Sequence, residues 1–276
     1  RYFSSAASDV YKRQEFMLHQ SEFLSKPLGV FFAHLLFIVS PMSVSAMTLT
    51  IAVGGEYPPY HSKQLPGYGI NAQIVTAAFK TQNVEVKYVH LPTWKEAFDF
   101  AAQGKADATA LWELNEEYQE SFLISDVVYK INAHFFYKVD KTFDWDSVED
   151  LDGLKVSALI GGYYGEPFEK AEQSGTLVVE RVHDEAEIIK KLLAGTIDVS
   201  PLYVTHVNYV LKSEGLELER ERLAYHPRPL FVNTLHLLLP NQNPESEQNL
   251  MTFNEGLKVI KKSGNLQSIL NAHLNY

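Results

Sequence analysis

The stretch GGEYPPYHSKQLPGYGINAQIVTAAF, residues 54–79, directly follows the alternating apolar run TLTIAV of residues 48–53. Alternation of this kind predicts a strand, whereas Ile74, Ala77 and Ala78 recur at the spacing of a helix. Between the two stand adjacent prolines flanked by tyrosines, which neither continue a helix nor sit inside a sheet. The stretch therefore predicts a strand, a proline-stiffened aromatic loop and a helix, which is how an α/β fold begins.

The alternation of strands and helices continues along the chain. The strand-like VEVKYVHL (84–91) precedes a helical WKEAFDFAAQG (94–104) and a strand-like ADATALW (106–112). The order β-α-β-α-β predicts a parallel sheet with right-handed crossovers. A second set of the same order fills the middle of the chain, and the apolar strand NTLHLLLP (233–240) and two helices follow it. We therefore expect an α/β protein with two similar halves.

Composition excludes several classes of function. The 276 residues carry a formal net charge of −10 without a long basic block, so the chain is a poor candidate for binding nucleic acid. The absence of cysteine excludes disulfides, thiolate metal sites and cysteine nucleophiles. The ten histidines are scattered without metal-site spacing and are better explained as single surface or core residues. We expect neither a metal nor a cofactor.

The N-terminal segment indicates export. Within residues 17–46, the apolar run 28–39 has the length of a signal-peptide core, and small residues occupy positions Val44 and Ala46. We expect cleavage after Ala46 and a periplasmic mature chain; the alternative is a retained N-terminal membrane anchor. Residues 1–16 have no place in a signal peptide and are interpreted as a non-native leader.

Motifs in a defined order then indicate a family. They are YPPY, GYGINAQIVTAAF, W...AFDFAAQGKADAT, SDVVY, VEDLDGLKVSALIGG, LLAGTIDVSPLY and GLKVIKKSGNLQSIL. Over residues 48–274 the chain resembles the bacterial extracellular solute-binding proteins, family 3, of the polar amino acid transport type. The resemblance implies a two-lobed, type II periplasmic-binding-protein fold, in which each lobe is a mainly parallel sheet flanked by helices and two crossing strands form the hinge. It places residues 47–130 plus 233–276 in lobe 1 and 131–232 in lobe 2.

The proline-stiffened loop is a natural wall for the ligand cleft, because α/β folds bind ligands at the carboxyl ends of their strands. Tyr57 and Tyr60 are expected to line the cleft; the alternative is that they pack beneath the loop. Gly162 and Tyr163 fall where the family's Gly-Thr turn contacts the solute, although a plain tight turn is the other interpretation.

The resemblance also marks a departure from the family. In amino-acid-binding members an arginine clamps the solute carboxylate and a second-lobe aspartate takes its ammonium. Tyr118 stands at the arginine position, Glu113 at the threonine before it, and Tyr203 at the aspartate position. Standard α-amino acid binding is therefore in doubt, because a solute charge would remain unpaired in a desolvated cleft.

The replacements favour a different solute. Aromatic faces and a carboxylate suit an organic cation, through cation–π attraction and an ion pair. For Glu113 the alternative is a solvated loop carboxylate, and for Trp112 it is core packing. Arg228 either reaches the cleft mouth or is a surface arginine. The candidate ligand-binding residues are Tyr57, Tyr60, Trp94, Trp112, Glu113, Tyr118, Gly162, Tyr163 and Tyr203.

The favoured function is a monomeric, non-enzymatic solute receptor that delivers a small polar solute, with an amine-bearing or cationic one preferred, to an inner-membrane ABC permease. Two alternatives stay open. The first is a ligand-sensing module for a membrane signalling partner. The second is a periplasmic dehydratase on the same scaffold, for which Glu113 is the one candidate acid or base.

Overall fold

The computed structural model describes residues 47–274, and Ala46–Tyr276 form one compact unit. The predicted leader 1–16, the signal peptide 17–46 and its cleavage after Ala46 lie outside the described residues. Within the described part of the chain, no helix has the length and apolar character needed to cross a membrane.

The opening stretch forms the predicted strand, loop and helix. β1 (Met47–Gly54) leads through the loop, with a short 3-10 helix η1 (Pro66–Tyr68), into α2 (Ile70–Lys80). The chain continues through β2 (Val84–Leu91), α3 (Trp94–Ala102) and β3 (Ala108–Glu113). β1 pairs in parallel with both β2 and β3. The predicted β-α-β-α-β unit is therefore present.

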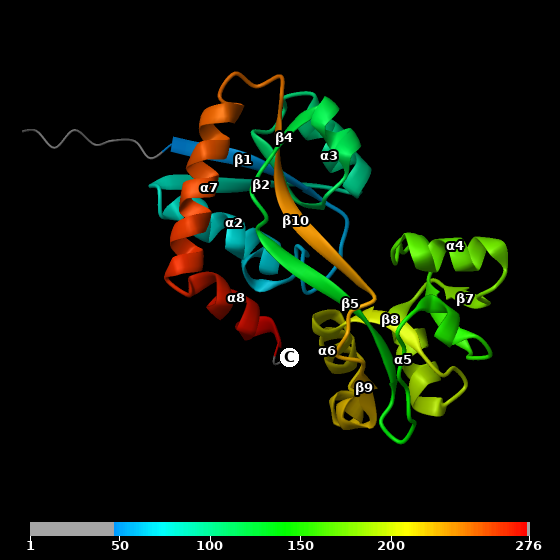
Figure 1. Ribbon diagram of the computed structural model, residues 1–276. Helices are drawn as coiled ribbons and strands as arrows, with labels where there is room; N and C mark the ends of the chain where they lie inside the picture. Colours follow the sequence, from blue (N-terminus) through cyan, green and yellow to red (C-terminus); the bar gives the residue numbers. More distant parts are fainter. Residues whose placement is uncertain (1–46, 275–276) are drawn as a thin grey trace, which may run out of the picture. The chain divides into compact units, whose positions relative to one another are not determined.

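Two long strands cross between the halves of the molecule. β5 (Tyr129–Lys138) and β10 (Phe231–Pro240) pair antiparallel and run side by side in Figure 1. After them come α7 (Ser246–Lys262) and α8 (Asn265–Leu274). The remaining elements are the 3-10 helices η2 (Glu116–Glu120), η3 (Val148–Leu151) and η4 (Glu217–Arg222), the strands β4 (Phe122–Ile124), β6 (Val156–Leu159), β7 (Val179–Val182), β8 (Ser200–Tyr203) and β9 (Leu223–Tyr225), and the helices α4 (Glu166–Ser174), α5 (Glu185–Ala194) and α6 (Val204–Ser213).

The main sheet is mixed, with strand order β2-β1-β3-β10-β5-β8. β10 runs antiparallel to β3, β4 and β5, and β5 runs antiparallel to β8 and β9. β6 and β7 form a separate parallel pair. The expectation of mainly parallel sheets therefore holds for the β-α-β units, whereas the crossing strands contribute antiparallel pairing.

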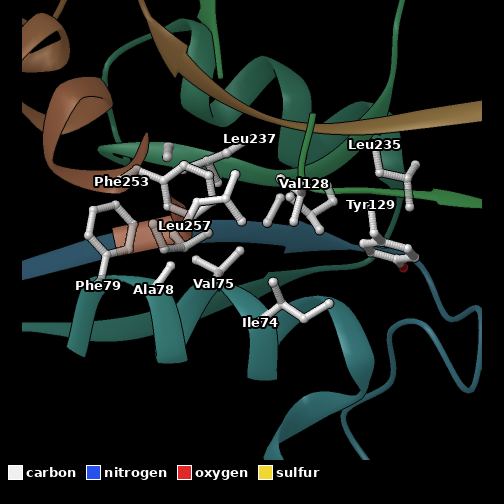
Figure 2. Packing of buried hydrophobic residues seen from close by; sticks show 14 of the residues in the cluster. Ile74, Val75, Ala78, Phe79, Val128, Tyr129, Leu235, Leu237, Phe253 and Leu257 are labelled. Atoms are coloured by element: carbon white, nitrogen blue, oxygen red, sulfur yellow. The ribbon is translucent and has the colours of Figure 1, made fainter. Parts of the chain in front are cut away.

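Each half has its own hydrophobic core. In the first, which we call the first lobe, α2 and α7 meet across Phe79 and Phe253, and Leu237 of β10 packs beside them (Figure 2). In the second, which we call the second lobe, Ile188 of α5 and Phe168 of α4 are fully buried, and each belongs to its own hydrophobic cluster. The boundaries 47–130 plus 233–276 and 131–232 stay a prediction.

Candidate functional site

A cavity of about 270 Å³ lies at the carboxyl ends of β1 and β3, where an α/β sheet presents its ligands. It is formed by the loop after β1, the starts of α2 and α3, the end of β3, η2 and the crossing strands β5 and β10. The lining residues are Tyr57, Tyr60, Asn71, Trp94, Leu111, Trp112, Glu113, Tyr118, Ile131 and Leu235. Six of the nine sequence-predicted residues thus surround one cavity.

The loop after β1 folds back on itself and presents two tyrosines. Tyr57 and His61 exchange backbone hydrogen bonds of 2.8 and 2.9 Å, which hold the turn around the two prolines. The rings of Tyr57 and Tyr60 stack with centroids 5.4 Å apart at 24°. Tyr60 is 5% exposed, so it both packs beneath the loop and contributes to the wall.

The opposite wall is a cluster of aromatic rings. Trp94 is the first residue of α3, whose start is fixed by a capping box between Thr93 and Glu96. Its ring meets Trp112 at 5.6 Å, and Trp112 meets Tyr118 at 5.9 Å. Trp112 also donates its indole N–H to Thr109 Oγ1 at 3.0 Å. Trp112 therefore combines the two roles considered for it, since it packs internally and lines the cavity.

Glu113 supplies the one charged group of the lining. Its side chain is exposed at the mouth of the cavity, yet the protein around its carboxyl raises the pKa of Glu113 by desolvation. Burial raises the pKa of Tyr118, and the charges of Glu113 and Glu117 raise it further. Among the described residues no lysine, arginine or histidine lines the cavity, so its electrostatics favour a positive ligand.

Sequence reasoning missed four lining residues: Asn71, Leu111, Ile131 and Leu235. Asn71 lies in the first turn of α2 and is 5% exposed. Its Oδ1 accepts a hydrogen bond from the Tyr129 hydroxyl at 2.5 Å. The amide NH₂ is the part of the side chain that can donate hydrogen bonds. A polar side chain in the first turn of the helix that follows the aromatic loop was the available signal.

The predicted second-lobe residues lie elsewhere. Tyr203 lines a neighbouring cavity of about 210 Å³, and its hydroxyl accepts a hydrogen bond from Asn233 Nδ2 at 3.1 Å. Tyr163 is 51% exposed and packs edge-on against Phe231, 5.2 Å between ring centroids. Gly162 and Tyr163 do not line the 270 Å³ cavity. Their contact with a solute stays a prediction, as does that of Tyr203.

A buried carboxylate–imidazole contact of the second lobe adjoins the aromatic loop. His206 of α6 and Glu185 of α5 are 6% and 8% exposed, and His206 Nε2 contacts Glu185 Oε2. The ring of Tyr57 stacks on His206, with centroids 4.8 Å apart at 19°. Burial raises the pKa of Tyr57 well above its ordinary value, with Glu185 the next contributor. The sequence offered no signal for this contact, because its partners are far apart along the chain.

Arg228 is engaged within the second lobe. Its guanidinium forms an ion pair with Asp146 at 2.8 Å and lies 5.5 Å from the centre of the Trp145 ring. It is absent from the lining of the 270 Å³ cavity. The geometry therefore matches the surface arginine rather than a carboxylate clamp at the cleft mouth.

A larger cavity, about 450 Å³, lies at the opposite end of the second lobe. Its lining includes Lys155 and Val156 at the start of β6 and Val178 just before β7. The amino ends of parallel strands are not where α/β folds place their ligands. Size alone therefore does not make it the site.

Two histidines beside the candidate cavity, the buried His61 and the half-buried His90, have ring nitrogens without hydrogen-bond partners. The rings of His61 and His90 stack at 5.5 Å, and all four ring nitrogens lack a partner. Within residues 47–274 no group of three or more His, Asp or Glu side chains is placed to hold a metal ion. Burial lowers the pKa of His61 to about 4; His90 and Lys63 act in the same direction and Glu56 opposes them.

We predict that His61 makes stability fall in mild acid. In the unfolded chain the imidazole takes up its proton near pH 6.5, whereas the folded chain resists protonation until about pH 4. The contribution is therefore complete above pH 6.5 and is lost as pH falls towards 4. The full shift corresponds to about 3 kcal/mol, which solvent screening reduces to on the order of 1 to 2 kcal/mol.

Urea unfolding at a series of pH values checks this. The variant His61→Phe should flatten the pH dependence between pH 6.5 and 4 relative to wild type, whereas replacing the exposed His183 in the same way should leave it unchanged. Equal slopes in His61→Phe and wild type would contradict the prediction.

Comparison with known proteins identifies the family. The family model for bacterial extracellular solute-binding proteins, family 3, matches residues 49–276, and the chain belongs to this family. A search of curated proteins found no match.

Solved structures give the fold. The second substrate binding domain of a putative amino acid ABC transporter from Streptococcus pneumoniae is 21% identical with a TM-score of 0.65, covering 82% of this chain and 99% of that one. Substrate binding domain 2 of Lactococcus lactis GlnP, in an open conformation, is 19% identical with a TM-score of 0.65, covering 83% and 96%. A histidine kinase sensor domain similar to periplasmic binding proteins is 20% identical with a TM-score of 0.59, covering 82% and 96%. The predicted two-lobed, type II periplasmic-binding-protein fold is therefore confirmed.

Proposed function

We propose that this chain is a periplasmic receptor for a small organic cation or amine-bearing solute, which it delivers to an ABC-type membrane transporter. The observation that carries the proposal is the lining of the 270 Å³ cavity. The lining combines five aromatic side chains and one carboxylate, Glu113. None of the described residues that line the cavity is basic.

The cavity chemistry supports a cation in two ways. The faces of Tyr57, Trp94 and Trp112 offer the negative side of an aromatic quadrupole, which attracts a cation within about 6 Å of the ring centre. The Glu113 carboxylate supplies the opposite charge. An anionic solute has no cationic partner in the lining and would lose its hydration without compensation.

That the partner is an ABC-type transporter and that the receptor is a monomer are part of the same proposal. They rest on family membership and on solved relatives described as parts of amino acid ABC transporters. An enzymatic role has less support, because the family consists of binding proteins and Glu113 lacks a neighbouring base in the cavity lining.

A sensing role is the second candidate. The similarity to a histidine kinase sensor domain favours it, since that domain uses the same fold. In this role the solute-bound form would contact a membrane signalling protein instead of a permease. The two roles are distinguished by testing whether the immobilised chain captures a purified permease or a purified signalling protein, each with and without solute.

Thermal stabilisation of residues 47–276 by a solute panel tests the proposal. We expect quaternary amines and polyamines to raise the melting temperature, because a ligand at about 100 times its Kd adds about 2.7 kcal/mol to the unfolding free energy. Ordinary α-amino acids and organic acids should have little effect. Stabilisation by organic acids alone would overturn the cationic assignment.

A further inference from the structure

Tyr57 has two roles in the structure, and the second depends on the second lobe. It lines the 270 Å³ cavity, and its ring also stacks on His206, 4.8 Å between centroids and nearly parallel. Tyr60 stacks on Tyr57 at 5.4 Å and shares a side-chain hydrogen bond with Thr205, the residue before His206. The aromatic loop therefore contacts the first turn of α6 at two adjacent points.

The ring on which Tyr57 lies is held by Glu185. Glu185 is the first residue of α5, whose N-cap Asp184 accepts a hydrogen bond from the backbone of Ala186. A carboxylate at the start of a helix is stabilised by the helix dipole and is fixed in position by the helix. The Glu185 carboxyl group contacts Nε2 of His206 and so holds the imidazole ring in one orientation. In that orientation the face of the ring is turned towards Tyr57.

We propose that the Glu185–His206 pair is a positioning element for the candidate site. It fixes the imidazole ring that orients Tyr57 in the cavity, and it thereby couples contact between the lobes to the shape of the solute site. Neither Glu185 nor His206 lines the cavity, so their effect on the solute is exerted through Tyr57.

The energetics favour such a role over a purely stabilising one. Two polar side chains less than a tenth exposed lose much of their hydration, and a buried hydrogen-bonded pair adds little net stability compared with apolar residues of similar size. Removing one partner is costly, because the other polar group is left buried without its partner. The pair therefore contributes more to a defined orientation than to the free energy of folding.

The solute role of Tyr57 rests on the proposed function, whereas contact between the lobes does not. The test is therefore a distance measurement that needs no solute. The chain has no cysteine, so spin labels attach only where cysteines are introduced. Gln103, at the end of α3, and Gln173, in α4, are exposed and lie in different lobes, which makes Gln103→Cys with Gln173→Cys a suitable labelling background.

In this background, double electron–electron resonance between the two spin labels should show a short-distance population when no further residue is changed. Glu185→Gln keeps the shape of the side chain and replaces its carboxyl group with an amide, and we expect it to move at least half of that population to longer distances. Tyr57→Ala removes the stack from the first-lobe side and should do the same. His183→Ala, an exposed histidine beside α5, is the matched control and should match wild type.

Both shifts are required. An unchanged distribution in either Glu185→Gln or Tyr57→Ala overturns the proposal, because the coupling would then not run through this contact. If Glu185→Gln does not fold, Glu185→Leu combined with His206→Leu removes both polar partners together and carries the same expectation. If no member of the solute panel binds, the proposed function fails while the distance result still decides this inference.

Discussion

The variant Gly54→Ala is expected to lower the free energy of unfolding by about 3 kcal/mol, at the upper end of what overpacking costs. Gly54 ends β1, and a Cβ at this position would lie 2.1 Å from the carbonyl oxygen of Thr93 and 2.9 Å from Ala97 Cβ. That carbonyl accepts the N–H of Ala97 in the first turn of α3. The added methyl group therefore meets the backbone of a helix, which cannot rotate away as a side chain would.

The displacement reaches the candidate site because Trp94 follows Thr93 directly. Moving the start of α3 away from β1 moves Trp94 relative to Trp112 and Tyr57. We therefore expect Gly54→Ala to weaken solute binding as well as stability. Urea unfolding followed by circular dichroism measures the first effect, and the thermal shift with a quaternary amine measures the second.

Two matched variants separate the effects. Gly256→Ala places a Cβ 2.1 Å from the carbonyl oxygen of Ala78, so it creates the same kind of clash between α7 and α2, away from the cavity. It should cost similar stability without the loss of binding. Thr48→Ala, at the exposed start of β1, should stay within about 0.5 kcal/mol of wild type. Gly54→Ala with wild-type stability would show that strand and helix separate more easily than the packing indicates.

Periodicity in the sequence predicted local structure well and long-range pairing poorly. The alternating residues 48–53 and the helical spacing around Ile74 gave β1 and α2 directly. The antiparallel pairing of β10 with β5 joins segments far apart in the chain, and no local pattern encodes it. Only the family resemblance led to the expectation of two crossing strands.

The candidate site divides in the same way. Tyr57 could be predicted as a lining residue because it follows a strand end, where an α/β fold places its ligands. Glu113 could be predicted because it stands at a position that the family resemblance marks. The contact between His206 and Glu185 could not be predicted, since the sequence shows only a histidine in one helix and an acidic residue at the start of another. Their contact depends on how α5 and α6 pack, which is a property of the folded second lobe.

Neutralising Glu113 is expected to weaken binding of a quaternary amine by about 10- to 100-fold, which corresponds to about 1.4 to 2.7 kcal/mol for loss of a charge-assisted contact. Choline is the probe, and isothermal titration calorimetry is the measurement. Glu113→Gln retains the size and hydrogen-bonding capacity of the side chain, so the expected loss reports the charge. Glu117→Gln, an exposed carboxylate in the following turn and outside the cavity lining, is the control and should bind as wild type does.

A pair of ligands sharpens the test. In 3,3-dimethyl-1-butanol the trimethylammonium group of choline is replaced by a neutral group of the same shape. Wild type should prefer choline, and Glu113→Gln should lose most of that preference while its affinity for the neutral analogue changes little. Because desolvation raises the pKa of Glu113, wild-type affinity for choline should also fall as the pH is lowered through that raised pKa, and Glu113→Gln should not show this fall. A choline preference that is equal in both proteins and independent of pH would mean that the aromatic wall alone selects the cation.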